Sequence, residues 1–330
     1  MKLSIVIPCY RSENTIQRVV DELVDTIRTR ADVDYEIFLV CDCSPDNVWD
    51  VIRQICKQNE KVHGICLAKN FGQHAALMAG YRFCTGDYVI SLDDDGQSAG
   101  NELFRLVDAL ESGYDVVYAD YPVKKESLFR LLGSEVNSWM NEVMIDKPKN
   151  IVPNSYFIAK AFVIQEMLKY KNAFPYVDGL IFRATKNIGK VEITHRAREE
   201  GSSGYTLKKL LSLWLNGFTT FSVKPLRIAS ILGVICACMG FVYGAIVVVQ
   251  RLLDQTPIAG WSSMMAMLLF IGGVIMMMLG MIGEYIGRIY ICLNNSPQYV
   301  IRDFINCPGS TVGECYTNEK DTVFFGAEKV

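Results

Sequence analysis

Residues 88–97 read Tyr-Val-Ile-Ser-Leu-Asp-Asp-Asp-Gly-Gln, a short apolar run that ends in three consecutive carboxylates, Asp93, Asp94 and Asp95. The run predicts a buried strand with the carboxylates at its carboxyl end. Ligands of open α/β sheets bind at that edge. Adjacent carboxylates repel one another, and their hard oxygens suit Mg²⁺ or Mn²⁺, usually held by one or two carboxylates plus substrate phosphates. The stretch therefore predicts a cation site, with a solvated acidic turn as the alternative.

The segments around this stretch alternate between two hydrophobic patterns. Short apolar runs predict strands at 3–7, 35–40, 62–67, 88–92 and 115–119, and further short strands at 154–162 and 190–195. Apolar residues at helical spacing, or a helix-forming composition, predict helices at 16–27, 49–58, 73–84 and 102–111. This alternation predicts an α/β fold with a mainly parallel, Rossmann-like sheet and helices on both faces.

Beyond residue 120 the pattern becomes helical and then strongly apolar. Residues 127–144 predict a core helix, or a wall for a lipid tail. Residues 206–221 are apolar with Lys208 and Lys209 to one side, which favours a helix in the membrane interface over a buried core helix. Residues 228–249 and 258–283 contain no charge and are long enough to cross a bilayer, so we expect two transmembrane helices.

The distribution of charge around these two runs predicts their orientation. Basic residues stand before the first run and after the second, whereas the connection at 250–257 carries only Arg251 and Asp254. The positive-inside rule then places both ends in the cytoplasm. We expect a catalytic domain at 1–205, an interfacial amphipathic helix at 206–225, a two-helix hairpin at 226–290 and a cytoplasmic tail at 291–330, with little fixed structure from Asp303 on.

Composition agrees with a folded domain joined to membrane spans. Of 330 residues, 50% are hydrophobic and 21% charged, and the mean hydropathy is +0.18. The net charge of −3 and the lack of a basic stripe argue against a nucleic-acid partner. The 11 cysteines are scattered without zinc-site spacing, which predicts reduced thiols. The N-terminus runs straight into a strand and does not resemble a signal peptide, so we expect the first domain to stay in the cytoplasm.

Other polar residues follow the predicted strands and should lie along the same edge as the Asp cluster: Pro8, Tyr10, Glu13, Asp42 and Lys69. A carboxylate such as Asp42 can accept hydrogen bonds from a base or ribose, and metal-bound carboxylates can neutralise a diphosphate. No Gly-x-Gly-x-x-Gly or Walker loop is present, so a dinucleotide or ATP site lacks its fingerprint. The constellation predicts a nucleotide-sugar site.

Several segments resemble glycosyltransferase family 2, and more narrowly its polyprenyl-phosphate group, which includes dolichol-phosphate mannose synthases, bactoprenol glucosyltransferases and undecaprenyl-phosphate aminoarabinose transferases. They are Ile-Pro-Cys-Tyr-Arg-Ser-Glu-Asn at 7–14, Lys-Asn-Phe-Gly-Gln-His-Ala-Ala-Leu at 69–77, Thr-Gly-Asp at 85–87 and Leu-Asp-Asp-Asp-Gly-Gln at 92–97. Residues 201–205 and 221–227 resemble the segment that precedes the family's spans. The resemblance extends from residue 1 to about residue 302, and the order of the motifs is its most specific feature.

The resemblance implies a GT-A-type fold and an inverting transfer, from a nucleotide diphosphate (most often UDP) to the phosphate of a polyprenyl chain. Asp42 takes the place of the nucleoside-binding Asp, and Asp93 and Asp95 match the metal-binding Asp-x-Asp. The implied donor-binding set is Pro8, Tyr10, Glu13, Asp42, Lys69, Asp93, Asp94 and Gln97. The implied cofactor is Mg²⁺ or Mn²⁺. The resemblance also implies a membrane-bound homo-oligomer of the inner or plasma membrane that serves cell-envelope glycans.

The late loop of the family closes over the two phosphates. Arg196, Arg198, Ser203 and Tyr205 lie where this loop binds the acceptor phosphate. Both arginines also suit the departing diphosphate, because guanidinium presents a bidentate fork to phosphate. The predicted catalytic set is Asp95, Arg196, Arg198 and Asp178; Asp178 is a replacement carboxylate or a helix cap. His74 and His195 are further participants or structural histidines.

The chain departs from the family pattern at three places. Cys41-Asp42-Cys43-Ser44 replaces Asp-Asp-Gly-Ser, Ser98-Ala99-Gly100 replaces the usual Pro-Pro region, and Ser155 stands near a position where many relatives carry Asp. The loss of a catalytic base is compatible with sugar transfer to a phosphate, because a phosphate monoester is already largely anionic at neutral pH. Two alternatives remain: a polysaccharide synthase, which two spans and the lack of Gln-x-x-Arg-Trp disfavour, and a catalytically silent nucleotide-binding membrane scaffold.

Overall fold

The computed structural model describes residues 1–121, 151–194, 196, 261–294 and 296–306, together with positions 233, 235, 242 and 249. The predicted helices at 127–144 and 206–221 lie outside these residues. The chain divides into two compact units, Met1–Gly204 with Asn295–Val330, and Tyr205–Asn294. Each unit is considered by itself.

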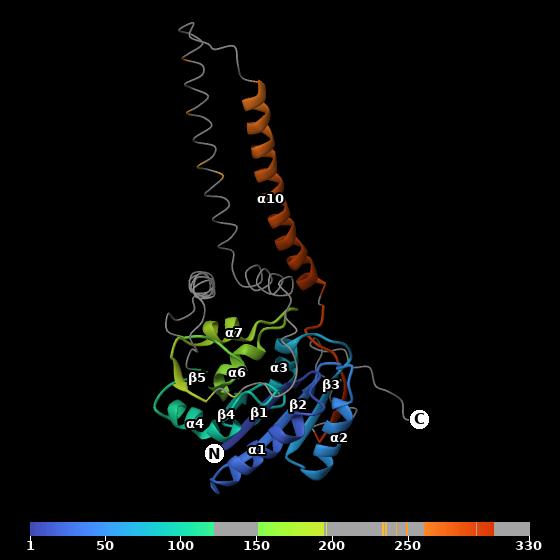
Figure 1. Ribbon diagram of the computed structural model, residues 1–330, viewed down its shortest axis with the longest axis vertical. Helices are drawn as coiled ribbons and strands as arrows, with labels where there is room; N and C mark the ends of the chain where they lie inside the picture. Colours follow the sequence, from blue (N-terminus) through green and yellow to red (C-terminus); the bar gives the residue numbers. More distant parts are fainter. Residues whose placement is uncertain are drawn as a thin grey trace, which may run out of the picture. The chain divides into compact units, whose positions relative to one another are not determined.

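The first unit is built on an eight-stranded sheet in the order β7-β5-β6-β4-β1-β2-β3-β8; Figure 1 shows its central strands β4, β1, β2 and β3 side by side. Its strands are β1 Lys2–Cys9, β2 Asp34–Cys41, β3 Val62–Leu67, β4 Tyr88–Ser91, β5 Val116–Asp120, β6 Phe157–Lys160, β7 Ile188–Glu192 and β8 Ile301–Ile305. The β1–β2, β1–β4, β2–β3 and β5–β7 pairs are parallel, whereas β6 and β8 pair antiparallel to their neighbours. The expected GT-A-type α/β fold with a mostly parallel sheet is confirmed.

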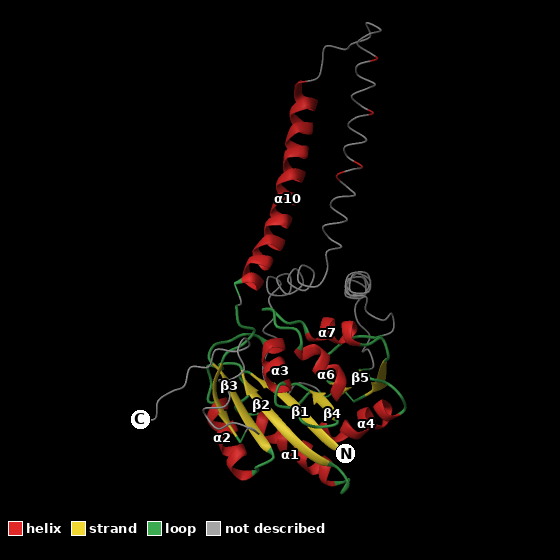
Figure 2. Cartoon of the chain, turned by 180° about the vertical axis from the view of Figure 1, so that it is seen from behind, coloured by secondary structure: helices red, strands yellow, loops and turns green. Residues whose placement is uncertain are grey.

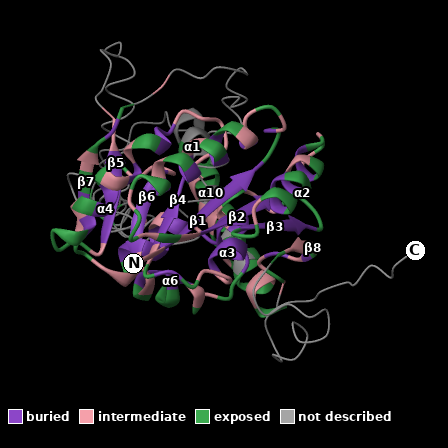
Figure 3. Cartoon of the chain, turned by 90° about the horizontal axis from the view of Figure 1, so that it is seen from below, coloured by how far each residue is buried: buried purple, intermediate pink, exposed green. Residues whose placement is uncertain are grey.

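Helices cover both faces of this sheet. One face carries α1 Ile16–Arg28, α2 Val48–Gln58 and α4 Leu103–Glu111, whose apolar sides share one core with strand side chains. The other carries α3 Gln73–Tyr81, α6 Ala161–Leu168 and α7 Val177–Ala184, which pack against one another. A 3₁₀ turn at Gly100–Glu102 precedes α4. Apart from the first residue of β1 and the first two of β2, the central strands β1, β2 and β3 are buried (Figure 3), as expected for parallel strands covered on two sides.

Two features of the sheet differ from the sequence expectation. The segment expected as a strand at 154–162 is β6 only over Phe157–Lys160, and it lies antiparallel between β4 and β5. The chain from Asp303 was expected to have little fixed structure, but Ile301–Ile305 forms β8 at the edge of the sheet. The expectation was wrong for Asp303–Ile305, because β8 takes its order from pairing with β3 and from burial of Ile301, which is 1% exposed; residues 307–330 lie outside the described residues.

The second unit contains α10 Trp261–Leu293, a single uninterrupted helix in Figure 2. Within it, Ile271–Leu293 is long and apolar enough to cross a membrane, and large apolar side chains such as Met276 and Leu279 are exposed. Of the run at 228–249 the structure describes four positions, each helical, so the first span stays a prediction.

Candidate functional site

The site lies at the carboxyl edge of β1, β2 and β4. These three strands are parallel neighbours, so the residues that follow them meet at one edge. The backbone N–H of Tyr10, after β1, donates to Asp94 Oδ2 at 2.8 Å. The backbone N–H of Asp42, after β2, donates to the carbonyl oxygen of Cys9 at 3.2 Å. The Asp cluster and Asp42 therefore flank the end of β1, as the sequence predicted.

Backbone donors hold the Asp42 carboxylate. The N–H of Phe71 donates to Oδ1 and the N–H of Gly72 to Oδ2, each at 2.8 Å. Gly72 has a φ of +91°, a left-handed conformation that favours glycine. Asp42 is 4% exposed; burial raises its pKa, and the two N–H bonds oppose that rise. Each carboxylate oxygen has a second lone pair, so the group keeps acceptor capacity for a base or ribose.

Side-chain donors hold Asp93. Gln73 Nε2 donates to Asp93 Oδ1 at 2.8 Å, and the Ser155 hydroxyl donates to Oδ2. In Asp95, Oδ1 accepts the backbone N–H of Gln97 at 3.1 Å. These three hydrogen-bond donors are neutral groups that orient the two carboxylates.

The carboxylate oxygens of Asp93 and Asp95 fit a hard cation that is shared with a substrate. Within the described parts of the chain, no group of three or more His, Cys, Asp or Glu side chains is arranged to hold a metal. Two carboxylates completed by diphosphate oxygens and water are the usual mode for Mg²⁺. Asp93 and Asp95 stay the predicted ligands.

Asp94 fixes the loop that follows β1. Besides the Tyr10 bond, its main-chain oxygen accepts Thr15 Oγ1 at 2.7 Å, and burial raises the pKa of its carboxyl to about 6. Asp94 thus ties the Asp cluster to the segment leading into α1. That contact gives Asp94 a structural role beside its predicted donor-binding role.

The loops after β1 and β2 are joined by a second set of contacts. Glu13 accepts the N–H of Asn47 at 2.9 Å at the start of α2, a favourable place for a carboxylate. Asp46 accepts the N–H of Glu13 at 3.1 Å and the Ser44 hydroxyl at 2.6 Å. The N–H of Arg11, whose φ is +59°, donates to Ser44 at 2.8 Å. Glu13 therefore orders these loops in the described structure.

The other residues predicted to bind the sugar donor differ in exposure. Pro8 is buried within β1. Tyr10 is exposed, with the Arg11 guanidinium 5.5 Å from its ring centre. Lys69 is exposed with its Nζ 4.9 Å from the ring centre of Phe71. Tyr10 and Lys69 are therefore accessible to a ligand, and their binding roles stay predictions.

The backbone of Arg196 is bonded to the segment that directly follows the Asp cluster. Its N–H donates to the carbonyl oxygen of Gln97 at 3.2 Å, whereas its guanidinium bonds to Glu22 at 2.7 Å and to Asn101 at 2.9 Å. The predicted phosphate contact would need the guanidinium to exchange these partners. Arg198, Ser203, Tyr205 and His195 lie outside the described residues.

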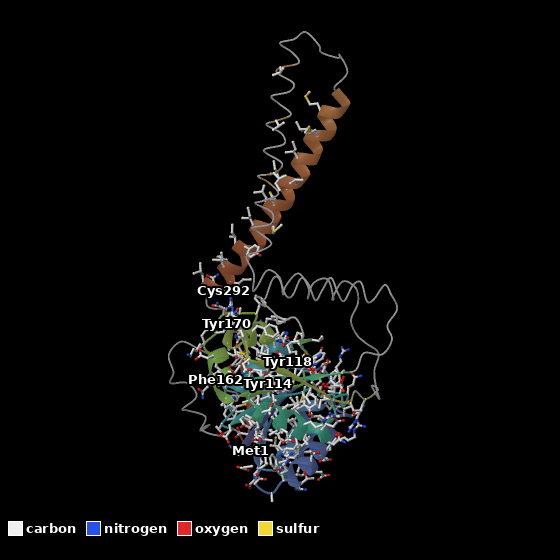
Figure 4. The ribbon with its side chains drawn as sticks, turned by 90° about the vertical axis from the view of Figure 1, so that its left-hand side faces the viewer. Met1, Tyr114, Tyr118, Phe162, Tyr170 and Cys292 are labelled. Atoms are coloured by element: carbon white, nitrogen blue, oxygen red, sulfur yellow. The ribbon has the colours of Figure 1, made fainter. Side chains whose placement is uncertain are left out.

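Asp178 and His74 belong to a polar cluster next to the site. Asp178, in the first turn of α7, accepts the Tyr118 hydroxyl at 2.9 Å, and burial raises its pKa to about 6. Tyr118 belongs to β5 and is buried in the first unit (Figure 4). His74 Nδ1 accepts the N–H of Val177 at 3.4 Å, and burial lowers its pKa to about 4, which makes it neutral at pH 7. Gln73 and His74 thus connect Asp93 with α7.

Sequence reasoning did not assign roles to Gln73, Phe71, Gly72 or Ser155 at the site. The signal was present in the segment Lys-Asn-Phe-Gly-Gln at 69–73, whose Gly permits the turn that aims two N–H groups at Asp42. Ser155 was noted only as a departure from the family.

Comparison with known proteins identifies the family. The model of glycosyl transferase family 2 matches residues 4–170, half of the chain, and this match includes the carboxyl ends of β1, β2, β3 and β4. The chain belongs to glycosyl transferase family 2. This glycosyltransferase also matches the family model of the GtrB C-terminal hairpin at residues 224–289.

Two curated relatives cover nearly the whole glycosyltransferase. The uncharacterized glycosyltransferase YkcC of Bacillus subtilis is 31% identical over 303 residues, 92% of this chain and 94% of the relative. The undecaprenyl-phosphate 4-deoxy-4-formamido-L-arabinose transferase of Proteus mirabilis is 31% identical over 311 residues, with the same two coverages. Among solved structures, glucosyl-3-phosphoglycerate synthase from Mycobacterium tuberculosis with UDP is similar at 17% identity and a TM-score of 0.47, covering 67% of this chain and 78% of that one.

Proposed function

We propose that this glycosyltransferase moves a sugar, with inversion, from a nucleotide diphosphate to a polyprenyl phosphate. The observation that carries the proposal is the combination, in one chain, of a family 2 domain and a GtrB-type hairpin. The apolar helix α10 is suited to a membrane, where a polyprenyl acceptor keeps its tail. The name of the Proteus mirabilis relative supports undecaprenyl phosphate or a similar lipid as the acceptor.

The donor is proposed to be a UDP-sugar bound along the edge of the sheet. Asp42 would accept hydrogen bonds from the nucleoside, with its carboxylate already oriented by Phe71 and Gly72. Asp93 and Asp95 would hold Mg²⁺ or Mn²⁺ together with the diphosphate. The ion would supply charge neutralisation for the departing diphosphate.

A polyprenyl-phosphate acceptor would remove the need for a strong catalytic base. A phosphate monoester is largely doubly ionised at neutral pH, so one of its oxygens can attack the anomeric carbon directly. The new bond joins that carbon to the acceptor oxygen. The bond to the donor diphosphate breaks, and the diphosphate leaves with the electron pair. The protein then chiefly positions two phosphates and offsets their repulsion, tasks proposed for Arg196, Arg198, Ser203 and Tyr205.

The proposed location is the cytoplasmic side of the inner or plasma membrane. It rests on the basic residues that flank both predicted spans and on their scarcity in the connection at 250–257. Both termini would then be cytoplasmic. Self-association through the spans is part of the same proposal.

Incubation of membranes containing this chain with a radiolabelled nucleotide sugar tests the proposal. We expect a lipid-extractable product that carries one sugar. A polymeric product would indicate a polysaccharide synthase instead. Nucleotide binding without turnover on any donor would indicate a silent scaffold.

A further inference from the structure

We infer that β8, which follows the membrane hairpin in sequence, is a positioning element for Asp42. The inference rests on the proposed function, because it treats Asp42 as the nucleoside-binding carboxylate. It extends that function by making donor binding depend on residues 300–306, which lie beyond the hairpin and far from the family 2 match at 4–170. Two chains of contacts connect β8 with Asp42.

The first connection runs through the backbone. The carbonyl oxygen of Val300, immediately before β8, accepts the N–H of Ala68 at 2.8 Å. Ala68 follows β3 and begins the loop whose Phe71 and Gly72 donate to the Asp42 carboxylate. The side chain of Asn70 in the same loop donates to the Asp42 carbonyl oxygen at 3.3 Å. The loop at 68–72 is therefore held by Val300 at one end and bonds to Asp42 at the other.

The second connection runs through a side chain at an irregularity of the strand pair. Cys66 lies opposite Asp303 and Leu67 opposite Ile301, so the register shifts and Arg302 is the residue left over. Such bulges re-aim a side chain. Nη2 of Arg302 donates to Cys66 Sγ at 3.1 Å. Cys66 pairs in register with Cys41, which directly precedes Asp42.

β8 is itself firmly anchored at its far end. Asn306, with φ at +58°, donates through Nδ2 to the carbonyl oxygens of Cys56 at 2.8 Å and Val62 at 3.2 Å. Its own carbonyl oxygen lies 2.5 Å from His63 Nδ1. Asn tolerates this left-handed conformation better than most residues. β8 is therefore a fixed support against which the loop at 68–72 can be placed.

The test uses the full-length protein with Arg302→Ala and a matched variant, Asp303→Ala. Asp303 is the next residue of β8, and its side chain forms an exposed ion pair with Arg53 at 3.3 Å, away from the contacts described above for the loop at 68–72. We expect Arg302→Ala to speed amide hydrogen exchange over 68–72 about tenfold, the effect of losing one hydrogen bond made by a charged group. The Kd for UDP in the presence of Mn²⁺ should rise about fivefold or more. Asp303→Ala should leave both unchanged.

Two further variants separate positioning from general stability. Arg302→Lys keeps a donor near Cys66 and should restore most of the exchange protection. The amides of β1 in the same samples report the overall fold. If Arg302→Ala does not fold, Cys66→Ala takes its place, because it removes the acceptor of the same bond. Hydrogen exchange over 68–72 and UDP binding are then measured in Cys66→Ala with the same expected results.

Exchange over 68–72 that is unchanged in the folded Arg302→Ala protein overturns the inference. Equal acceleration in Asp303→Ala also overturns it, because the effect would then be ordinary strand weakening. If the wild type binds none of UDP, GDP or CDP, the proposed function fails, while hydrogen exchange still decides the positioning role of β8.

Discussion

Asp42 and Asp93 lie at the same edge of the sheet, but the protein holds them by different means. The two oxygens of Asp42 accept backbone N–H groups from consecutive residues, Phe71 and Gly72. The two oxygens of Asp93 accept side chains, from Gln73 and Ser155. The segment 71–73 therefore contacts both carboxylates.

The positions of the two carboxylates should therefore be sensitive to different kinds of substitution. Removing a neighbouring side chain cannot delete a backbone donor, so the Asp42 arrangement depends on the conformation of its loop. The Asp93 arrangement depends on the identity of two side chains. We therefore expect backbone changes to affect nucleoside binding and side-chain changes to affect the metal and diphosphate.

The largest expected effect is the loss of the predicted metal ligands. Asp93→Ala and Asp95→Ala should each lower the transfer rate by about 10³-fold, because the charge on the departing diphosphate loses its electrostatic partner. The rate is measured as labelled sugar in the lipid extract. Asp25→Ala, an exposed carboxylate on α1, is the control and should keep full activity. Full activity in either test variant would refute the metal assignment.

A smaller effect is expected from the loop that holds Asp42. Gly72→Ala places a Cβ in open space at φ +91° and ψ 159°, so the cost of roughly 1–3 kcal/mol comes from the backbone alone. Relaxation of this strain should move the N–H groups off Asp42 and raise the KM for the donor about tenfold.

Gly113 offers the matched control for this variant. It has a φ of +125° and likewise no atom within 4 Å of an added Cβ, but it follows α4. Gly113→Ala should lower the melting temperature comparably and leave the donor KM unchanged. A raised KM in both variants would show that the Asp42 loop has no special role.

Ser155→Ala should have a milder effect on the other carboxylate. It removes the hydrogen bond from the Ser155 hydroxyl to Asp93 and leaves the bond from Gln73 in place. We expect the apparent affinity for Mn²⁺, measured by the metal dependence of transfer, to fall about fivefold. Ser112→Ala, which removes an exposed hydroxyl bonded to the Ala109 carbonyl, is the control. An unchanged metal dependence in Ser155→Ala would show that Ser155 does not orient Asp93 for the metal.

The smallest effect concerns pH and stability at Asp178. Burial raises the pKa of this carboxyl to about 6 from its ordinary value of 3.8. Between these two pH values the folded protein therefore binds more protons than the unfolded chain. The contribution of Asp178 to the free energy of unfolding is complete below pH 3.8 and is lost as pH rises through 6.

Asp178→Asn should remove this dependence, because an amide does not ionise and can still accept the Tyr118 hydroxyl. Its melting temperature relative to wild type should rise between pH 4 and pH 7. Asp25→Asn on the exposed face of α1 should show no such trend. A constant difference from wild type in Asp178→Asn would mean that this carboxyl does not titrate in that range.

The sequence predicted the features that depend on local pattern. The strand at 62–67 has the expected bounds because its apolar run is sharply delimited, and the Asp cluster lies at a sheet edge because it follows a buried strand. The antiparallel insertion of β6 was not predictable, since strand order depends on contacts between distant segments. The bond between Arg196 and Glu22 joins residues 174 positions apart, and no spacing rule indicates it.

The central claim is transfer of one sugar to a polyprenyl phosphate. The most direct measurement presents the purified full-length protein with undecaprenyl phosphate, Mn²⁺ and a panel of nucleotide sugars, and reads the mass of the lipid product. We predict that at least one donor gives a lipid whose mass has increased by a single sugar, and that Asp93→Ala abolishes that product. No glycolipid with any donor, or the same product in Asp93→Ala, would contradict the account.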